Sequence, residues 1–316
     1  MNSLIRPIEL KDLEWKDLEL KDLELKHQEL KHLPKQSATA SEMPAGIVLG
    51  MPHLCLAGLS ETWLLKECGH RHWLLLAEAA DLDRPEFRDE TGEPIYATFL
   101  AVSVRDAAFD AVREHDELVF SSRLTRISRT QFTSFHRLSI GARPIGQVAL
   151  TSTFVRRAQR GRNHSIVRAE VSGLPPIGIE PRAFTFAAQS AALRAGRWAT
   201  HLGFERRKAA VIDRFIVDPC PGQDFNGADF LYFASFQAFV DRAEWSFFRP
   251  DAPFPTTRRR DIIYRGNIDP GERVVASLLQ FRRHGETLGH WYSLERDRDS
   301  AAIADIFTVR GLPATP

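Results

Sequence analysis

Several short segments of the chain alternate apolar and polar residues, a pattern that predicts β-strands with one buried face. In the first half of the chain these segments follow a longer one, residues 58–80, in which Trp63 and Trp73 belong to an apolar set at helical spacing. This longer segment predicts a helix that Ser60 caps and that Gly69 could interrupt. The strands predicted after it are Ile95–Val104, Leu118–Ile127, Phe132–Ile140 and Gln147–Arg156.

The same order of elements recurs in the second half, roughly 155 to 170 residues further along the chain. Ala228–Trp245 predicts a second apolar helix, and the interval 173–215 before it predicts a connector that contains a helix over Phe184–His201. We therefore infer an internal duplication of one helix-and-strand unit. The strands predicted after the second helix are Asp261–Asn267, Arg273–Phe281, Thr287–Glu295 and Ala302–Val309.

A helix followed by a run of strands favours an α+β architecture, because helices and strands would alternate in a doubly wound parallel sheet. Each predicted helix is long enough for an antiparallel sheet to wrap around it. The pattern thus predicts two units, residues 46–172 and 216–316, joined by the connector at 173–215.

Residues 1–45 follow a different pattern. They contain a five-residue repeat, clearest over Leu10–Glu24, in which Leu or Trp, Lys, Asp, Leu and Glu succeed one another. A period of five matches neither the 3.6 residues per turn of a helix nor the 3.5 of a coiled coil, so the leucines form no single apolar face. We predict a low-complexity tail outside the two units.

Charge and cysteine content narrow the classes of function. The chain has 42 Lys and Arg residues against 41 Asp and Glu residues, so it lacks the global positive field of a typical nucleic-acid-binding protein. Cys55, Cys68 and Cys220 form no C-x-x-C pair, which argues against a disulfide framework and a four-thiolate zinc site. No apolar run reaches about 18 residues, and the N-terminal stretch carries Lys and Glu, so we expect a cytoplasmic protein without membrane insertion.

Two groups of residues resemble families of one fold. Asp224-x-x-Gly227, followed by Tyr232 and Asp241-Arg-Ala243, resembles the central helix of hot-dog-fold acyl-CoA thioesterases of the hydroxybenzoyl-CoA type, although extra residues separate Gly227 from Tyr232. A wider set resembles a hot-dog family of biosynthetic gene clusters, which includes the bifunctional acyltransferase/decarboxylase of leinamycin polyketide biosynthesis. That set comprises Gly50-Met-Pro-His53, Gly58-Leu-Ser-Glu61, Gly69-x-x-His72-Trp73, Asp224-Phe-Asn-Gly227, Leu231-Tyr-Phe-Ala234 and Arg260-Asp-Ile-x-Tyr264-x-Gly266-Asn267.

This resemblance implies a double hot-dog fold and chemistry on acyl thioesters. It implies an enzyme that takes an acyl unit of the methylmalonyl type from coenzyme A, decarboxylates it, and transfers the product to an acyl carrier protein in polyketide or other natural-product biosynthesis. Acyl-CoA is then a substrate, the acyl carrier protein is a partner, and no bound cofactor or metal is required. Fused units supply internally the pairing that single hot-dog units gain by association, so both a monomer and a homodimer remain open.

The two predicted helix starts carry the candidate catalytic groups, because the unpaired N–H groups of a helix start suit a thioester oxygen as it gains charge. Before the second helix, Asp224 is a candidate nucleophile or base and Asn226 a candidate donor to an oxyanion or enolate. An Asx turn with a helix cap is the structural interpretation of the same residues. Before the first helix, Ser60 is either a donor to the substrate or a cap.

A covalent route would need a nucleophile, and a tyrosine beside a base or a cation can serve. Tyr96 is the leading candidate because it begins the first strand after the first helix, next to the expected groove, and a packed strand tyrosine is the structural alternative. The predicted substrate-binding residues flank the helix starts or offer a loop imidazole or a guanidinium for coenzyme A phosphates, and they are Gly58, Leu59, Gly227, His53 and Arg260.

Three further functions remain open from the sequence. A thioesterase would use Asp224 as its base and release free acid and free thiol. A dehydratase would need a His and an acidic residue facing each other across the groove, and the sequence contains no G-x-x-x-x-P-G motif of that class. A non-catalytic subunit that binds an acyl carrier protein would tolerate changes at Asp224, Asn226 and Tyr96.

Overall fold

The computed structural model describes residues 45–159, 161–171, 174, 180–249 and 254–312. Apart from residue 45, the predicted N-terminal tail lies outside this part of the chain. Within the described ranges, no helix has the length and apolar character needed to cross a membrane.

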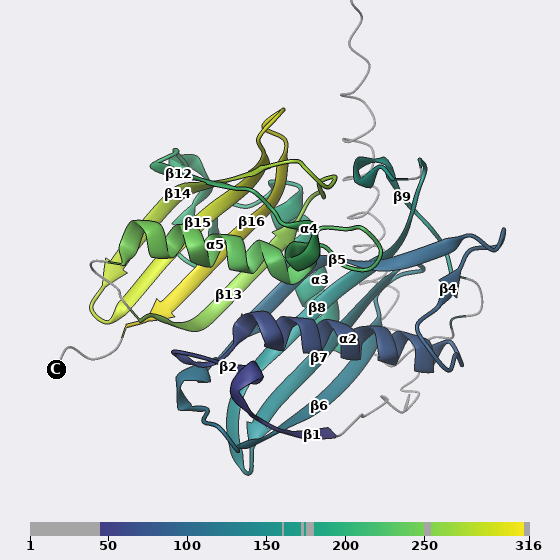
Figure 1. Ribbon diagram of the computed structural model, residues 1–316, viewed down its shortest axis with the longest axis horizontal. Coiled ribbons are helices and arrows are strands. Elements are labelled where there is room, and N and C mark those ends of the chain that lie inside the picture. The colour runs from purple at the N-terminus through teal and green to yellow at the C-terminus, as the bar shows by residue number, and fades with distance from the viewer. Residues whose placement is uncertain (1–44, 160, 172–173, 175–179, 250–253, 313–316) are drawn as a thin grey trace, which may run out of the picture.

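Two units of the same kind follow one another along the chain, and in each a long helix lies across an antiparallel sheet (Figure 1). The long helices are α2 (Glu61–Ala79) in the first unit and α5 (Phe233–Phe248) in the second. The strands of the first unit are β1 (Ala45–Val48), β2 (Leu54–Cys55), β3 (Gly58–Leu59), β4 (Phe87–Arg88), β5 (Pro94–Arg105), β6 (Glu117–Arg126), β7 (Gln131–Ile140), β8 (Arg143–Arg157) and β9 (Ile166–Arg168). Those of the second unit are β12 (Asp213–Val217), β13 (Thr256–Tyr264), β14 (Val274–His284), β15 (Thr287–Arg296) and β16 (Ala302–Gly311).

Shorter elements complete the chain. Between the units lie helix α3 (Pro181–Arg194) and the hairpin of β10 (Thr200–His201) and β11 (Phe204–Glu205), and the short helix α4 (Pro221–Asp224) precedes α5. The 3-10 turns are η2 (Met51–His53), η3 (Phe109–Ala111), η4 (Asn163–Ser165) and η5 (Arg206–Lys208).

Twelve strands form one sheet, in the order β1-β6-β7-β8-β5-β13-β16-β15-β14-β12, with β4 paired to β5 and β9 paired to β8. The units join where β5 and β13 pair antiparallel, from Ala101 opposite Ile263 to Val104 opposite Arg260. Successive strand residues point to opposite faces. Val102 accordingly packs in the core under α2 and α5, whereas Ala101 packs with residues of α3 on the other face.

One apolar core runs beneath both long helices, because α2 and α5 contact each other as well as the sheet. Its members come from both units and include Leu64, Leu65, Val102, Phe236, Phe239 and Ile262. The start of α5 is therefore positioned by the first unit as well as by its own sheet.

The first helix begins at its predicted cap. Ser60 caps α2, which starts at Glu61, and Gly58–Leu59 before the cap pairs with Leu54–Cys55 in a small hairpin. α2 continues without interruption through Gly69, where an added Cβ would lie 2.6 Å from the ring of Phe233. This glycine allows the two helices to approach closely.

The other two predicted helices are shifted along the chain. α5 begins at Phe233 and not at Ala228, since the preceding residues form a turn. α3 spans Pro181–Arg194, because Pro181 occupies its first turn and Gly196, at φ +69°, follows its last turn. The prediction of a helix over Phe184–His201 is therefore wrong in its boundaries.

We expect Gly69→Ala to lower the free energy of unfolding by about 1–2 kcal/mol, because overpacking of Phe233 outweighs the roughly 1 kcal/mol gained in helix propensity. Urea unfolding followed by circular dichroism measures the change. Gly222→Ala in α4 is the control, since nothing lies within 4 Å of an added Cβ there. An unchanged or raised stability of the Gly69 variant would contradict the close helix contact.

Candidate active site

A cavity of about 1360 Å³ lies where β5 and β13 diverge. The pairing of these strands stops at Ala101 and Ile263, whereas β5 extends back to Pro94 and meets β4 only at its first two residues. All six residues 95–100 line the cavity. Since alternate side chains of a strand point to opposite faces, residues from both faces of this stretch of β5 border the cavity. The unpaired edge of β5 therefore forms one border of the cavity.

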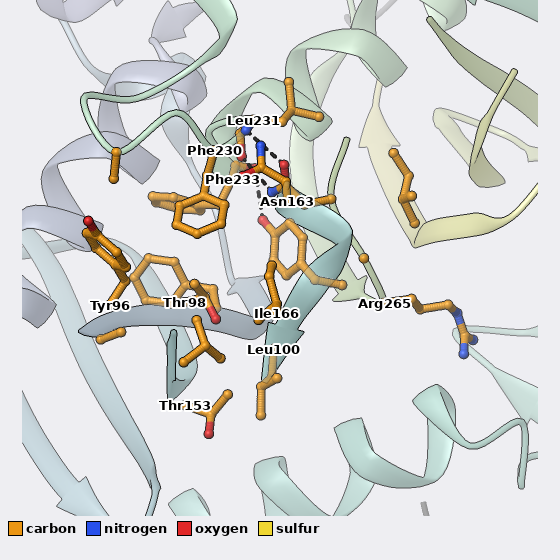
Figure 2. Close-up of a pocket in the computed structure, with 18 of the residues that line it drawn as sticks. Tyr96, Thr98, Leu100, Thr153, Asn163, Ile166, Phe230, Leu231, Phe233 and Arg265 are labelled. Atoms are coloured by element: carbon orange, nitrogen blue, oxygen red, sulfur yellow. Dashed lines mark hydrogen bonds between the residues drawn. The ribbon is translucent and has the colours of Figure 1, made fainter. Parts of the chain in front are cut away.

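Three of the predicted site residues lie together in this cavity: Tyr96, Asn226 and Gly227. Figure 2 shows Tyr96 beside Phe230, and their ring centroids are 5.6 Å apart. The guanidinium of Arg157 lies 5.8 Å from the centroid of the Tyr96 ring, so a cation is present beside the candidate nucleophile.

Asn226 forms the turn that delays the start of α5. Its Oδ1 accepts hydrogen bonds from the backbone N–H groups of Ala228 (3.0 Å) and Phe230 (3.1 Å). The structural interpretation of this residue as an Asx turn is therefore correct. Because both bonds use Oδ1, the Nδ2 group is the donor that Asn226 has left for a bound molecule.

The start of α5 is the helix start that borders the cavity. Its N-cap residue Tyr232 makes no side-chain capping hydrogen bond, and both Tyr232 and Phe233 line the cavity. Unpaired N–H groups and the helix dipole place partial positive charge at this point. In contrast, Ser60 Oγ caps α2 by accepting from the N–H of Trp63 at 3.3 Å.

Asp224 is buried behind the loop and is not part of the cavity wall. Its Oδ2 accepts from the N–H of Cys220 at 2.9 Å, and its carbonyl accepts from the N–H of Tyr232 at 2.7 Å and from Ser235 Oγ at 3.0 Å. The structure therefore places Asp224 where it holds the loop before α5, and does not bring its carboxylate together with Tyr96 and Asn226.

Four other predicted residues surround the start of α2, away from the cavity. Besides the cap residue Ser60, these are Leu59, which is buried, and Gly58, whose φ of +103° and lack of a Cβ allow close approach to Phe109. His53 Nδ1 accepts from the N–H of Gly50 at 2.8 Å. The structure assigns all four local structural contacts.

Arg260, predicted to bind coenzyme A phosphates, is fully buried and lies outside the cavity wall. Its guanidinium forms ion pairs with Glu61 at 2.8 Å and with Asp241 at 2.7 Å, and thus connects the start of α2 to the middle of α5. Arg310 joins the same cluster through Asp241 and through Glu244. A buried guanidinium with these partners is not accessible to a phosphate.

The charged groups around Arg260 lie in direct contact with one another. Burial opposes the ionisation of Glu244, but Arg310 and His290 outweigh it and hold the pKa of Glu244 at about 2. Glu244 is thus ionised and paired, whereas burial raises the pKa of Glu61 in spite of the neighbouring Arg260. These side chains fill the region between the start of α2 and β13.

Sequence reasoning missed most of the polar groups in the cavity wall. Thr153 Oγ1 is buried and has no hydrogen-bond partner in the described part of the chain, a state that a bound molecule would relieve. Asn163 Nδ2 donates to the carbonyls of Asp229 (2.6 Å) and Ile268 (2.7 Å), and its Oδ1 accepts from Arg157 Nε. The contacts of Asn163 with Asp229 and Ile268 join residues 66 and 105 positions apart, so sequence spacing could not indicate them.

The titratable groups of the wall are tyrosines and arginines. Among the described residues that line the cavity there is no Asp, Glu, His or Lys, so the acid and histidine that a dehydratase needs are not found there. Burial raises the pKa of Tyr232 to about 12 and raises that of Tyr264, whose hydroxyl donates to the carbonyl of Phe233 at 3.0 Å. The hydroxyl of Tyr264 is thus committed to a structural contact, and Tyr96 remains the candidate nucleophile.

Comparison with known proteins identifies the fold. No protein-family model matches the sequence, and neither does any curated protein. Among solved structures, the chain is similar to a 12:0-ACP thioesterase from Umbellularia californica, with a TM-score of 0.58, 8% identity, and coverage of 86% of this chain and 94% of that one. The chain has a hot-dog fold. An acyl-ACP thioesterase from Bacteroides thetaiotaomicron is similar to the same degree, with a TM-score of 0.57, 7% identity, and coverage of 85% and 97%.

We expect Arg260→Met to lower the free energy of unfolding by about 3–5 kcal/mol, because it leaves the buried carboxylate of Glu61 without its nearest cation. Arg259→Met is the control: its side chain is 33% exposed, and we expect a loss below about 1 kcal/mol. Thermal unfolding measures both. A stable Arg260 variant with weakened acyl-CoA binding would restore the substrate-binding interpretation of this residue.

Proposed function

We propose that the protein is an acyl-thioester enzyme, built from two fused hot-dog units, that reacts its substrate in the cavity beside the start of α5. The observation that carries this proposal is the convergence of Tyr96, Asn226 and an uncapped helix start in one cavity. The fold shared with two acyl-ACP thioesterases supports it.

The polarity of these groups suits the carbonyl of a thioester. Asn226 Nδ2 and the first N–H groups of α5 are donors, and an attacked thioester carbonyl develops negative charge on its oxygen. Apolar side chains of Trp73, Phe99 and Phe233 form the adjoining wall, where an acyl chain would be buried. The acyl chain and the carbonyl are thereby assigned to neighbouring parts of one cavity.

We propose hydrolysis as the reaction, because the solved structures that share the fold are thioesterases. When water attacks the carbonyl, the donors stabilise the oxyanion, and the departing thiolate takes up the proton that water loses, which gives free acid and free thiol. When the Tyr96 hydroxyl attacks, its proton goes to the departing thiolate and an acyl-tyrosine ester forms; water then hydrolyses this ester, which releases the acid and restores the hydroxyl. Asp224 is not assigned the role of base, since its carboxylate is buried behind the loop.

Acyl transfer coupled to decarboxylation is the second candidate, and the composition of the cavity wall favours it. The described wall residues include no carboxylate that would repel a malonyl-type carboxylate, and the apolar part of the wall disfavours the charged group that leaves as CO₂. The same Asn226 donor would stabilise the resulting enolate. This candidate also agrees with the resemblance to the biosynthetic hot-dog family.

Intact-protein mass spectrometry separates the two reactions. The protein is incubated with a holo acyl carrier protein and a panel of acyl-CoAs that includes malonyl-, methylmalonyl- and straight-chain thioesters. Free acid and free coenzyme A with an unloaded carrier indicate hydrolysis, and a carrier that gains acetyl or propionyl indicates transfer with decarboxylation. Binding without any turnover across the panel would contradict both and favour a non-catalytic carrier-binding subunit.

We expect Asn226→Asp to lower kcat about 10²–10³-fold, the usual effect of losing one oxyanion donor. This variant retains the Oδ1 acceptor for Ala228 and Phe230 and so keeps the turn. Asn226→Ala should lose at least tenfold in turnover and also some stability. A stable Asn226→Asp protein with unchanged kcat would remove this residue from the mechanism.

We expect Tyr96→Phe to abolish any covalent acyl-enzyme, because it removes the hydroxyl that would carry the acyl group. Tyr232→Phe is the matched control within the cavity, since the hydroxyl of Tyr232 is held protonated. Acid quenching and mass spectrometry detect the adduct. An adduct that survives in the Tyr96 variant would assign the nucleophile to another residue or to water.

A further inference from the structure

The candidate nucleophile and the candidate oxyanion donor come from different units. Tyr96 belongs to β5 of the first unit, whereas Asn226 belongs to the loop before α5 of the second. We call residues 226–231 the donor loop. Because a displacement of about 1 Å can lower a rate about 10²-fold, the proposed reaction depends on the contacts that hold the donor loop against the first unit.

Arg157, the last residue of β8, makes one of these contacts. Its side chain shares a face of the strand with Val155, which pairs with Tyr96 across the ladder of β5 and β8. Arg157 Nη2 donates a hydrogen bond to the carbonyl of Ala228, and the guanidinium carbon lies 3.9 Å from the centroid of the Phe230 ring. One side chain of the first unit therefore contacts two residues of the donor loop.

Asn163, in the 3-10 turn η4 that follows β8, makes the other contact. It is 2% exposed and lies beside the donor loop (Figure 2). Asn163 Nδ2 donates to the carbonyl of Asp229 at 2.6 Å and to that of Ile268 at 2.7 Å. Its Oδ1 accepts from Arg157 Nε at 3.0 Å, so the two side chains hold each other in place.

The end of the donor loop is fixed by its own unit, and its middle by the first unit. Asn267, after β13, accepts at Oδ1 from the N–H of Leu231 at 2.9 Å. In the middle, Asp229 has a φ of +61°, a left-handed conformation that residues other than glycine disfavour. Here the hydrogen bonds of Arg157 and Asn163 hold two consecutive carbonyls. Without these donors, the segment that carries the candidate oxyanion donor would be free to relax.

We propose that Arg157 and Asn163 are positioning residues, which hold the donor loop so that Asn226 and Tyr96 act on the same thioester carbonyl. Arg157 is not part of the cavity wall, and the side-chain amide of Asn163 is engaged with the protein. Both residues therefore act through the loop and not on the substrate. The inference rests on the proposed function for the roles of Asn226 and Tyr96.

Hydrogen exchange followed by mass spectrometry measures the hold on the loop without any turnover. In peptides that cover residues 226–231, we expect Arg157→Met and Asn163→Asp each to raise the exchange rate about tenfold or more, because the loop opens more often. Arg157→Met keeps an apolar side chain over the Phe230 ring, and Asn163→Asp keeps the size while it replaces the donor by an acceptor. Arg156→Met is the matched control, since Arg156 lies on the opposite face of β8 and its side chain is 47% exposed.

Kinetics test whether the position of the loop matters for the reaction. With a thioester that the wild-type protein turns over, we expect Arg157→Met and Asn163→Asp to lower kcat about 10–10²-fold and to change KM by less than about threefold, because burial of the acyl chain is unaffected. Arg157→Met in an Asn226→Asp protein should lower kcat little further, since the donor through which Arg157 acts is already lost. Arg156→Met should have the kcat of the wild-type protein.

Three results would overturn the assignment. An unchanged exchange rate in both variants would mean that the loop does not depend on these contacts. Faster exchange with unchanged kcat would make the contacts structural only. Losses that multiply when Arg157→Met and Asn226→Asp are combined would mean that Arg157 acts independently of the donor. Thermal unfolding shows whether each variant is folded, and either Arg157→Met or Asn163→Asp alone suffices for the first two comparisons.

The same measurements separate this inference from the proposed function. If the wild-type protein turns over no thioester, the proposed function fails, and faster exchange in the variants shows only that Arg157 and Asn163 attach the loop. If the wild-type protein is active and both variants match it in kcat, the positioning role fails and the proposed function stands.

Discussion

The two halves of the sheet meet through a short antiparallel ladder, in which residues 101–104 of β5 face residues 260–263 of β13. Where the ladder holds, Arg260 reaches the start of α2, and Ser103 Oγ donates to Asp261 across the junction. Where it ends, β5 stays paired with β8 on one side, while no strand of the described residues pairs with its other edge over residues 96–100. The length of this ladder therefore determines how much of the junction is closed by strand pairing and where the cavity begins.

Arginines on either side of this ladder differ in their partners. In the cluster around Arg260, carboxylates of Glu61, Asp241 and Glu244 surround the cations, and such closed clusters specify how elements dock more than they stabilise the fold. At the cavity, Arg194 lacks a carboxylate of this kind among the described residues. The two arginines therefore differ in whether a carboxylate of the described residues neutralises the guanidinium.

The helices, the strands and part of the site could be predicted from the sequence, because both depend on local patterns. Alternating strand residues predicted the strands from β5 to β8 closely, and the Asp224–Gly227 segment pointed to the loop that contains Asn226. The start of α2 was predicted from its cap residue Ser60, but the start of α5 was not, since an Asx turn occupies residues that helical spacing had assigned to the helix. Turn formation competes locally with helix formation, and periodicity does not record which of them prevails.

The charged residues could not be assigned from the sequence, because their roles depend on partners far along the chain. Arg260 stands in a run of three arginines typical of a solvated surface, yet it is fully buried and forms ion pairs with Glu61 and Asp241. Arg168 and Arg194 belong to different elements, and only the folding of β9 and α3 against the same cavity places both in its wall. Periodicity and spacing contain no information about such pairs.

The two helix starts differ in their caps and in their surroundings. The start of α2 is capped by Ser60 and packed against ion pairs, whereas the start of α5 has no side-chain cap and borders the cavity. A symmetric pair of identical chains cannot carry this difference, whereas a single chain that contains both units can. In an assembly of two identical chains, every substitution appears twice, so a residue that seals one cleft also seals its equivalent. Joining the units removes that constraint. One helix start can then become specialised for chemistry while the other holds the units together.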